Sequence, residues 1–165
     1  MNAQDETGFR EFVAGRSPAL LRTAYLLVGD RGRAEDLLQT ALVKTYLSWD
    51  RIRDGQATEV YVRRILINTA TSWWRRRWNS ETATDRLPET AVADAADRIA
   101  QSDEVRRALL RLPARQRAAV VLRYYEDLGE AEVAEALGVS RGTVSRYLTR
   151  ALHTLRTKLN EEVMA

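Results

Sequence analysis

The segment TSWWRRRWN, residues 71–79, concentrates two side-chain types that often contact nucleic acids. It holds three of the four tryptophans of the chain and three consecutive arginines. Guanidinium groups bind phosphates, and indole rings stack on nucleobases or lie at membrane interfaces. The segment therefore allows three interpretations: a nucleic-acid surface, a membrane-surface helix, or the basic end of a buried core.

Helical periodicity separates these side-chain types, because successive residues lie about 100° apart around a helix. Trp73 and Trp74 fall in the apolar arc of a helix predicted over about 57–78. We expect them to pack in a domain core rather than to stack on bases or lie on a membrane. The opposite arc is polar and suits phosphates and unpaired bases. Its members are Arg64, Asn68, Ser72, Arg75 and Arg76.

A second candidate surface lies in the segment GEAEVAEALGVSRGTVSRYLTRALHTLRTKL. Its spacing predicts a helix over 130–137, a turn in which Gly138 suits a left-handed backbone and Ser140 an N-cap, and a second helix from Arg141. Such a helix-turn-helix places its second helix in the DNA major groove. A plain helical hairpin with a charged exterior is the alternative. The expected contacts to duplex DNA are Arg141, Thr143, Arg146, Tyr147 and Arg150.

The elements that must hold these residues are helices, because no segment alternates with the period of a strand. In the N-terminal half, the pattern predicts one helix that begins at Ser17-Pro18 and stops before Gly29, and a second over about 33–49. Further helices are predicted over 105–112 and 115–126, separated by a proline.

This organisation predicts an all-α fold of two small helical domains, residues 1–79 and 103–165, the second being the helix-turn-helix. Residues 80–102 are rich in Ala, Thr, Asp and Glu and contain Pro88. We expect them to form a flexible acidic linker.

The charge of the chain is unevenly distributed although its net value is only +3. Residues 61–79 hold five arginines and no acid, residues 80–104 hold seven acids and two arginines, and residues 141–165 hold five basic residues and two acids. Two basic blocks suggest two surfaces for a polyanion, although solvated helix faces would give the same pattern.

The composition excludes several classes of site. The chain has no cysteine and one histidine, His153, which excludes disulfides, thiolate metal sites and histidine metal clusters. A nuclease would need a carboxylate cluster, but the acids are mostly scattered on helix exteriors or in the linker. No secretory signal opens the chain, and no apolar run approaches the roughly 20 residues that span a bilayer. We expect a cytoplasmic protein without cofactor, catalytic residue or membrane insertion.

Several segments resemble one bacterial family. EALGVSRGTVSRYLTRALHTLR resembles the promoter-reading helix-turn-helix of sigma factors, and LPARQRAAVVLRYYEDL resembles the opening of their fourth domain. AEDLLQTALVKTYLSWDRI followed by YVRRILINTATSWWRRR resembles their second domain. With only these two domains, the chain resembles the extracytoplasmic-function type. Its SWWRRRW segment is similar to the corresponding segment of a subgroup common in actinobacteria.

The resemblance implies a non-catalytic factor that binds core RNA polymerase and directs promoter-specific initiation. The first domain would bind the polymerase clamp, through Asp36 and Gln39, and the melted −10 strand, where Asn68 matches a family asparagine. The second domain would read the −35 element as duplex, and the linker would thread toward the active site and the RNA exit path. An anti-sigma factor is a further partner that the family allows.

The chain departs from the family pattern at three places, which weakens the transfer of individual contacts. Thr40 stands where the family often has Glu, and Ser72 where it often has Asp. Ser145-Arg146-Tyr147 replaces a common Lys-Ser-Arg, which displaces the arginine by about 100° around the helix. The −35 sequence that this chain recognises therefore does not follow from the sequences that other members of the family recognise.

A stand-alone helix-turn-helix regulator is the alternative function. It leaves the helix that carries Asp36 and Gln39, and the basic helix over 57–78, without a role. The polar loop from Asp50 to Thr58 contains Gly55, and we expect it to form a pocket for a flipped base and to set −10 specificity.

Overall fold

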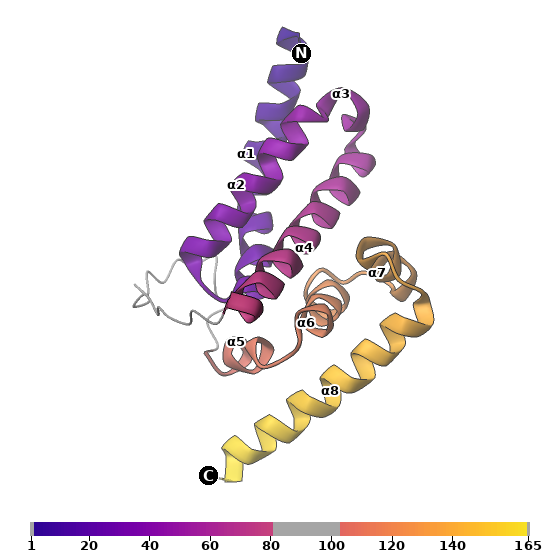
Figure 1. Ribbon diagram of the computed structural model, residues 1–165. Helices are drawn as coiled ribbons and strands as arrows, with labels where there is room; N and C mark the ends of the chain where they lie inside the picture. The colour runs from indigo at the N-terminus through magenta and orange to yellow at the C-terminus, as the bar shows by residue number, and fades with distance from the viewer. Residues whose placement is uncertain (1, 81–102, 165) are drawn as a thin grey trace.

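A computed structural model describes residues 2–80 and 103–164, and this part of the chain contains helices and no strand (Figure 1). The predicted all-α fold is confirmed. The predicted linker lies outside the described residues except for Ser80, which ends a helix. The elements are α1 (Ala3–Val28), α2 (Arg31–Leu47), α3 (Trp49–Ile52), α4 (Gly55–Ser80), α5 (Asp103–Leu110), α6 (Ala114–Val120), the π-helical turn η2 (Val121–Tyr125), α7 (Glu130–Leu137) and α8 (Arg141–Met164).

The N-terminal unit consists of α1 to α4. Helices α1, α2 and α4 lie side by side, with α3 joining α2 to α4 at one end (Figure 1). Apolar residues at helical spacing, such as Leu37 and Ala41 of α2 and Val62 and Leu66 of α4, are buried between them.

Helix α1 begins much earlier than the sequence predicts. The predicted start at Ser17-Pro18 is wrong, because the helix runs from Ala3 and contains Pro18. Its N-cap is Asn2, whose side chain accepts a hydrogen bond of 2.8 Å from the Asp5 amide. The added turns carry Phe9, which packs edge-on against aromatic rings of α2 and α3. The stabilisation from this packing and from the cap offsets the loss of the backbone hydrogen bond that Pro18 cannot donate.

The C-terminal unit consists of α5 to α8. The predicted helix-turn-helix is present: α7 ends at Gly138, which has a left-handed φ of 70°, and the Ser140 hydroxyl accepts a 3.1 Å hydrogen bond from the Thr143 amide at the start of α8. The helix predicted over 115–126 divides into α6 and η2. Helices α7 and α8 pack on each other and on α6, and their buried residues include Val133, Leu137, Val144, Leu148 and Ala151.

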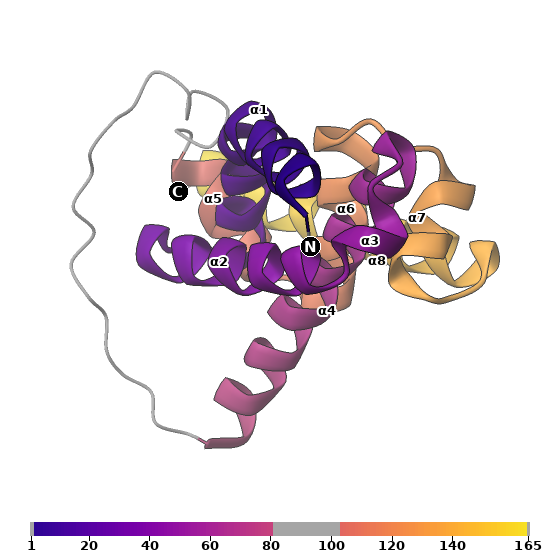
Figure 2. The ribbon, with the colours of Figure 1, turned by 90° about the horizontal axis from the view of Figure 1, so that it is seen from above.

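The two units pack on each other at the C-terminal end of α1, where α5 and α6 lie against it (Figures 1 and 2). Arg117 of α6 is buried and donates hydrogen bonds to the Leu27 carbonyl, at 2.7 Å, and to carbonyls of Leu109, Leu110 and Leu112. These bonds join the last turn of α1 to the end of α5 and the turn that follows it.

Two more contacts complete this junction. Arg106 of α5 donates a 3.1 Å hydrogen bond to the Gly29 carbonyl. The Leu110 side chain lies so close to Gly29 that a Cβ atom there would come within 2.5 Å of a Leu110 methyl carbon. We call the contacts of Leu27 and Gly29 with Arg106, Leu110 and Arg117 the α1 junction.

Replacing Gly29, the C-cap of α1, with alanine should destabilise the protein, whereas Gly15→Ala, inside α1, should not. Gly29 has φ of 77°, which costs an L-residue roughly 1–2 kcal/mol, and the methyl group would also force the Leu110 side chain to shift. Gly15 has open space around its Cβ position, so the higher helix propensity of alanine should raise stability by roughly 0.5–1 kcal/mol. Urea unfolding of both variants measures the difference. Equal stabilities for the two variants would contradict this role of Gly29.

Candidate nucleic-acid and partner surfaces

The polar face predicted on α4 is present and divides into occupied and open positions. Asn68 and Arg76 are exposed, and Ser72 is half-buried and lies 3.3 Å from the Arg76 guanidinium. Arg64 is half-exposed and donates a 3.2 Å hydrogen bond to the Glu135 carbonyl of α7. Arg75 belongs to the same helix, but its side chain lies outside the part of the chain that the structure describes.

The opposite arc of α4 is buried, as its periodicity predicts. Ile67 and Ala70 belong to the core, and Trp73 is half-buried against it. Trp74 is also half-buried, but its ring lies under the Arg117 guanidinium, 4.5 Å from the ring centroid. The prediction that these tryptophans pack in a domain core is confirmed for Trp73, whereas Trp74 packs against Arg117 of the C-terminal unit.

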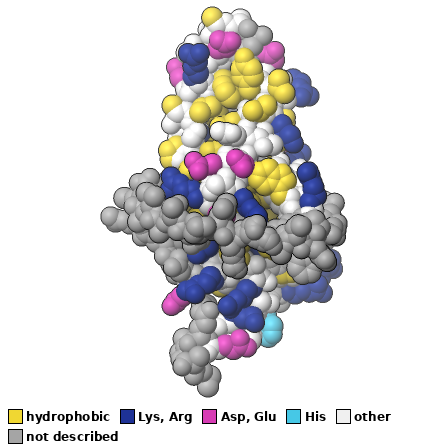
Figure 3. Space-filling view, turned by 60° about the vertical axis from the view of Figure 1, so that its left-hand side comes forward, with side chains coloured by type: hydrophobic (Ala, Val, Ile, Leu, Met, Phe, Trp, Pro, Cys, Tyr) yellow, Lys and Arg dark blue, Asp and Glu magenta, His cyan; other side chains and the backbone are white. Residues whose placement is uncertain are grey.

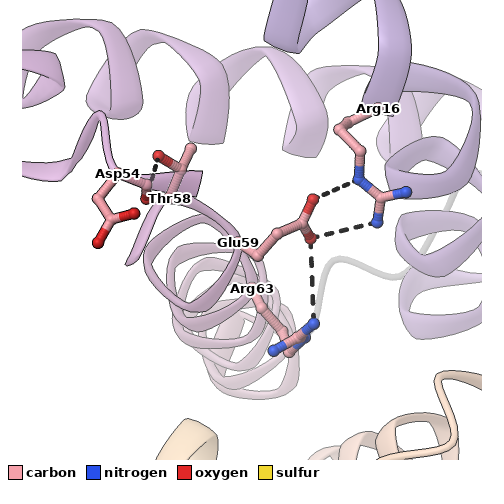
Figure 4. A network of polar contacts seen from close by, with 5 residues as sticks. All are labelled: Arg16, Asp54, Thr58, Glu59 and Arg63. Carbon is pink, nitrogen blue, oxygen red and sulfur yellow. Dashed lines mark hydrogen bonds and ion pairs between the residues drawn. The ribbon is translucent and has the colours of Figure 1, made fainter. Parts of the chain in front are cut away.

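The loop before α4 is shorter and more ordered than the sequence predicts. Residues 49–52 form α3, with Ile52 buried, and α4 begins at Gly55. The buried Thr58 hydroxyl donates to the Ile52 carbonyl. It also lies 3.2 Å from the Asp54 carbonyl (Figure 4). Helical backbone and a buried threonine therefore occupy much of the segment expected to form a pocket for a flipped base.

Ion pairs fix this end of α4 in place. Figure 4 shows the Glu59 carboxylate between two guanidinium groups, that of Arg16 from α1 and that of Arg63, 4.0 Å away. Arg63 therefore shares the Glu59 carboxylate with Arg16, whereas Arg76, further along the helix, is exposed. Such a paired arginine contributes less to a phosphate-binding face than an exposed one.

Arg53 ties the same loop to the start of α1. Its guanidinium lies 2.8 Å from the Asp5 carboxylate, and this hydrogen bond holds the pKa of Asp5 below its usual value. A lowered carboxyl pKa stabilises the folded state above the ordinary pKa of aspartate, and the contribution is lost as the pH falls through the lowered value. The contact is therefore fully effective at neutral pH.

The exposed face of α8 carries most of the residues predicted to contact duplex DNA. Arg141, Arg146 and Arg150 are exposed. The Thr143 hydroxyl lies 3.0 Å from that of Ser140 and accepts a 3.1 Å hydrogen bond from Arg146, which orients this guanidinium at the start of the helix. Tyr147 is half-buried and packs against the core, so its ring faces the protein more than the sequence predicts.

A third surface lies on α2. Asp36 and Gln39 are exposed, on the side opposite buried Leu38. Val43 and Leu47 follow on the same side at helical spacing and are 59% and 77% exposed. Figure 3 shows hydrophobic side chains at the surface in the upper part of the molecule, where α1 and α2 lie. Their spacing from Gln39 places Val43 and Leu47 on the same side of the helix, and this signal in the sequence could have predicted an apolar surface there.

No group of three or more His, Cys, Asp or Glu residues in residues 2–80 and 103–164 is placed to hold a metal ion. No helix in the same part of the chain is long and apolar enough to cross a membrane.

The surfaces on α4 and α8 fall in segments that match two protein families. Residues 12–80 match the family described as Sigma-70 region 2, and residues 102–155 match Sigma-70, region 4. The chain is 46% identical to the RNA polymerase sigma-E factor of Streptomyces avermitilis over 92% of its own length and 84% of that protein. It is 34% identical to the ECF RNA polymerase sigma factor SigM of Mycobacterium tuberculosis over 90% of this chain and 76% of that protein.

Solved structures share the fold. The sigma factor RpoE of Bartonella quintana, in complex with the anti-sigma factor NepR, superposes with a TM-score of 0.71 at 24% identity, covering 92% of this chain and 96% of that one. CnrH, in complex with the cytosolic domain of CnrY, superposes with a TM-score of 0.69 at 22% identity, covering 96% of this chain and 94% of that one.

Proposed function

The chain belongs to the sigma-70 family of RNA polymerase sigma factors, extracytoplasmic-function type, and from this premise we propose which surfaces contact the polymerase and each promoter element. As a sigma factor it directs promoter-specific initiation by core RNA polymerase. One observation supports the detailed proposal: exposed basic faces on α4 and α8 lie in the two segments that match sigma regions 2 and 4.

Helix α8 reads the −35 element as duplex. It follows the turn of a helix-turn-helix, whose second helix enters the major groove. Arginine recognises guanine edges with two parallel hydrogen bonds, and the Thr143 contact pre-orients Arg146 for this role. Thr143 and Tyr147 support the arginines, while Arg141 and Arg150 contact phosphates.

Helix α4 binds the −10 element as a melted strand. Opening a duplex without ATP requires that the protein bind unpaired bases better than paired ones, because unstacking costs a few kcal/mol. Asn68 offers amide hydrogen bonds to an unpaired base edge, and Ser72 lies one turn further along. Arg64, Arg75 and Arg76 supply affinity for phosphates that weakens steeply with salt.

The exposed side of α2 binds the polymerase clamp through Asp36 and Gln39. The protein has no catalytic role of its own and acts in the cytoplasm, where its polymerase and promoters are. An anti-sigma factor regulates it; the solved relatives RpoE and CnrH support this, since one is in complex with an anti-sigma factor and the other with the cytosolic domain of CnrY. A stand-alone helix-turn-helix regulator is disfavoured, because it would leave the α2 and α4 faces without ligands.

Reconstitution tests the proposed function. Core RNA polymerase plus this protein, supplied with sheared genomic DNA, should initiate at discrete start sites that neither component uses alone. Mapping of the RNA 5′ ends gives the −10 and −35 elements. Absence of initiation across the genomic DNA would refute the proposal, and binding to promoter duplex without polymerase would favour the stand-alone regulator.

Asn68→Ala should impair promoter opening more than polymerase binding. The side chain is exposed on the α4 face and distant in sequence from the α2 clamp residues. Permanganate footprinting measures melting, and a binding titration with core polymerase measures association. Asn160→Ala removes an exposed amide near the end of α8 and serves as the control. Equal losses of melting and polymerase binding for Asn68→Ala would contradict the assignment.

Arg146→Ala should weaken −35 recognition by roughly 1–3 kcal/mol and relax the preference at one base pair. Arg156→Ala is the matched control, because it removes the same charge from an exposed site further along α8. Selection sequencing with randomised −35 elements, read for both variants in the reconstituted holoenzyme, separates base recognition from general charge loss. An unchanged preference in Arg146→Ala would exclude a base contact.

A further inference from the structure

We propose that Asp5, in the first turn of α1, positions Arg53 to contact the edge of an unpaired guanine in the −10 strand. Neither residue belongs to the α4 face proposed to bind that strand. Asp5 also lies upstream of residue 12, where the match to Sigma-70 region 2 begins. The inference rests on the proposed function and deepens it, because it adds a residue that determines specificity and a residue that positions it.

The contact between these two side chains is asymmetric. The Arg53 guanidinium lies 2.8 Å from the Asp5 carboxylate, and the Arg53 side chain is 60% exposed while that of Asp5 is 10% exposed. An enclosed carboxylate needs a cationic partner, whereas an arginine at the surface is solvated by water. Asp5 engages one guanidinium nitrogen, Nη1, and the other N–H groups of the fork remain to donate to a ligand.

The α1 side of this contact is held in place by the helix that carries it. Asn2 caps α1 by accepting a 2.8 Å hydrogen bond from the Asp5 amide. One turn further on, Phe9 packs edge-on against Trp49 of α3, with ring centroids 5.4 Å apart, and Phe12 packs on the same indole. The first turns of α1 therefore lie beside α3 at one end of the N-terminal unit (Figure 1), which fixes Asp5 relative to the turn that follows α3.

The turn that carries Arg53 is held on its other side by α4. Ile52, before it, is buried, and its carbonyl accepts a hydrogen bond from the Thr58 hydroxyl. The Asp54 carbonyl, after it, accepts a 2.9 Å hydrogen bond from the Thr58 amide. Because its backbone and its guanidinium are both held, Arg53 loses little conformational freedom when it binds a ligand.

The charges around Arg53 favour the edge of a base over a phosphate as its ligand. Residues 50–54 include two arginines and two aspartates, and Asp5 adds a third carboxylate. A phosphate brought to Arg53 would meet these carboxylates, whereas the edge of a neutral base would not be repelled by them. Guanine presents two acceptors, O6 and N7, to an arginine, and this is the commonest specific contact of arginine with a base.

The start of α4 offers an apolar surface for such a base. Ala57 and Val60 are exposed there, and the same side of the helix continues to Arg64 and Asn68. The face of a base is apolar and can lie on these two small side chains while its edge meets Arg53. Helix α4 rises roughly 20 Å from its start to Asn68, so Arg53 and Asn68 contact different bases of the strand.

Selection sequencing with randomised −10 elements in the reconstituted holoenzyme tests the proposal. Arg53→Gln should reduce the preference for guanine at one −10 position by roughly five- to hundredfold, because glutamine lacks the guanidinium fork. Asp5→Asn should reduce the same preference several-fold, since it leaves Arg53 without its charged partner. Combining the two changes should reduce the preference no further than Arg53→Gln alone, because Asp5 acts through Arg53.

Glu6→Gln is the matched control, because Glu6 is the exposed acid beside Asp5 in the first turn of α1 and undergoes the same change of charge. Its base preference should equal that of the wild-type chain. The preference is a ratio between sequences selected by one protein population, so partial unfolding of a variant lowers the yield of every sequence equally. Urea unfolding of each variant measures the loss of stability separately.

Four results would overturn the inference: a wild-type chain without a guanine preference in the −10 element, an unchanged preference in Arg53→Gln, an unchanged preference in Asp5→Asn, or equal changes in Asp5→Asn and Glu6→Gln. Lower stability of Asp5→Asn with an unchanged preference would show a purely structural role. Uniformly weaker binding of all −10 sequences by Arg53→Gln, with a shallower salt dependence, would show a phosphate contact instead. Failure of the proposed function would appear separately, as absence of initiation by the wild-type chain with core polymerase.

Discussion

The last turn of a helix leaves carbonyl groups without partners, and in α1 the C-terminal unit supplies the donors. Arg117 reaches the Leu27 carbonyl and Arg106 the Gly29 carbonyl, so the negative end of the α1 dipole meets two positive charges although its own last turn contains no basic residue. Burial lowers the pKa of Arg117 to about 10, which leaves it cationic at neutral pH. Its charge, and with it the junction, is therefore insensitive to pH in the physiological range.

The arrangement of the functional surfaces depends on this junction. Because Arg117 contacts both the end of α1 and the Trp74 ring, it fixes α6 against α1 and α4 together. Helix α7 also packs against α4. The exposed sides of α2 and α8 remain available while Arg64 is occupied. One buried guanidinium thus connects the packing of a small all-α protein to the accessibility of the α4 face proposed to bind the promoter strand.

Periodicity predicted the helices and most of their faces, because amphipathic spacing is a local property. The helix-turn-helix, with Gly138 and its Ser140 cap, follows directly from residue types. The start of α1 could not be predicted from local residue types. Aromatic packing of Phe9 against α2 and α3 outweighs the local tendency of Pro18 to begin a helix. Arg117 lies one helical turn before buried Val121 and on the same side, and this spacing could have predicted that Arg117 is buried. Its partners Leu27 and Trp74 lie across the predicted linker, and no local pattern reports a contact between two units.

We expect the α1 junction to couple the two units into one folding body in the free chain. Differential scanning calorimetry distinguishes coupled units from independent ones. Coupled units should unfold in a single transition whose calorimetric and van't Hoff enthalpies agree, because Arg117 cannot lose the partners of one unit without disturbing the other. Two separable transitions, one for each unit, would show that the junction does not couple them.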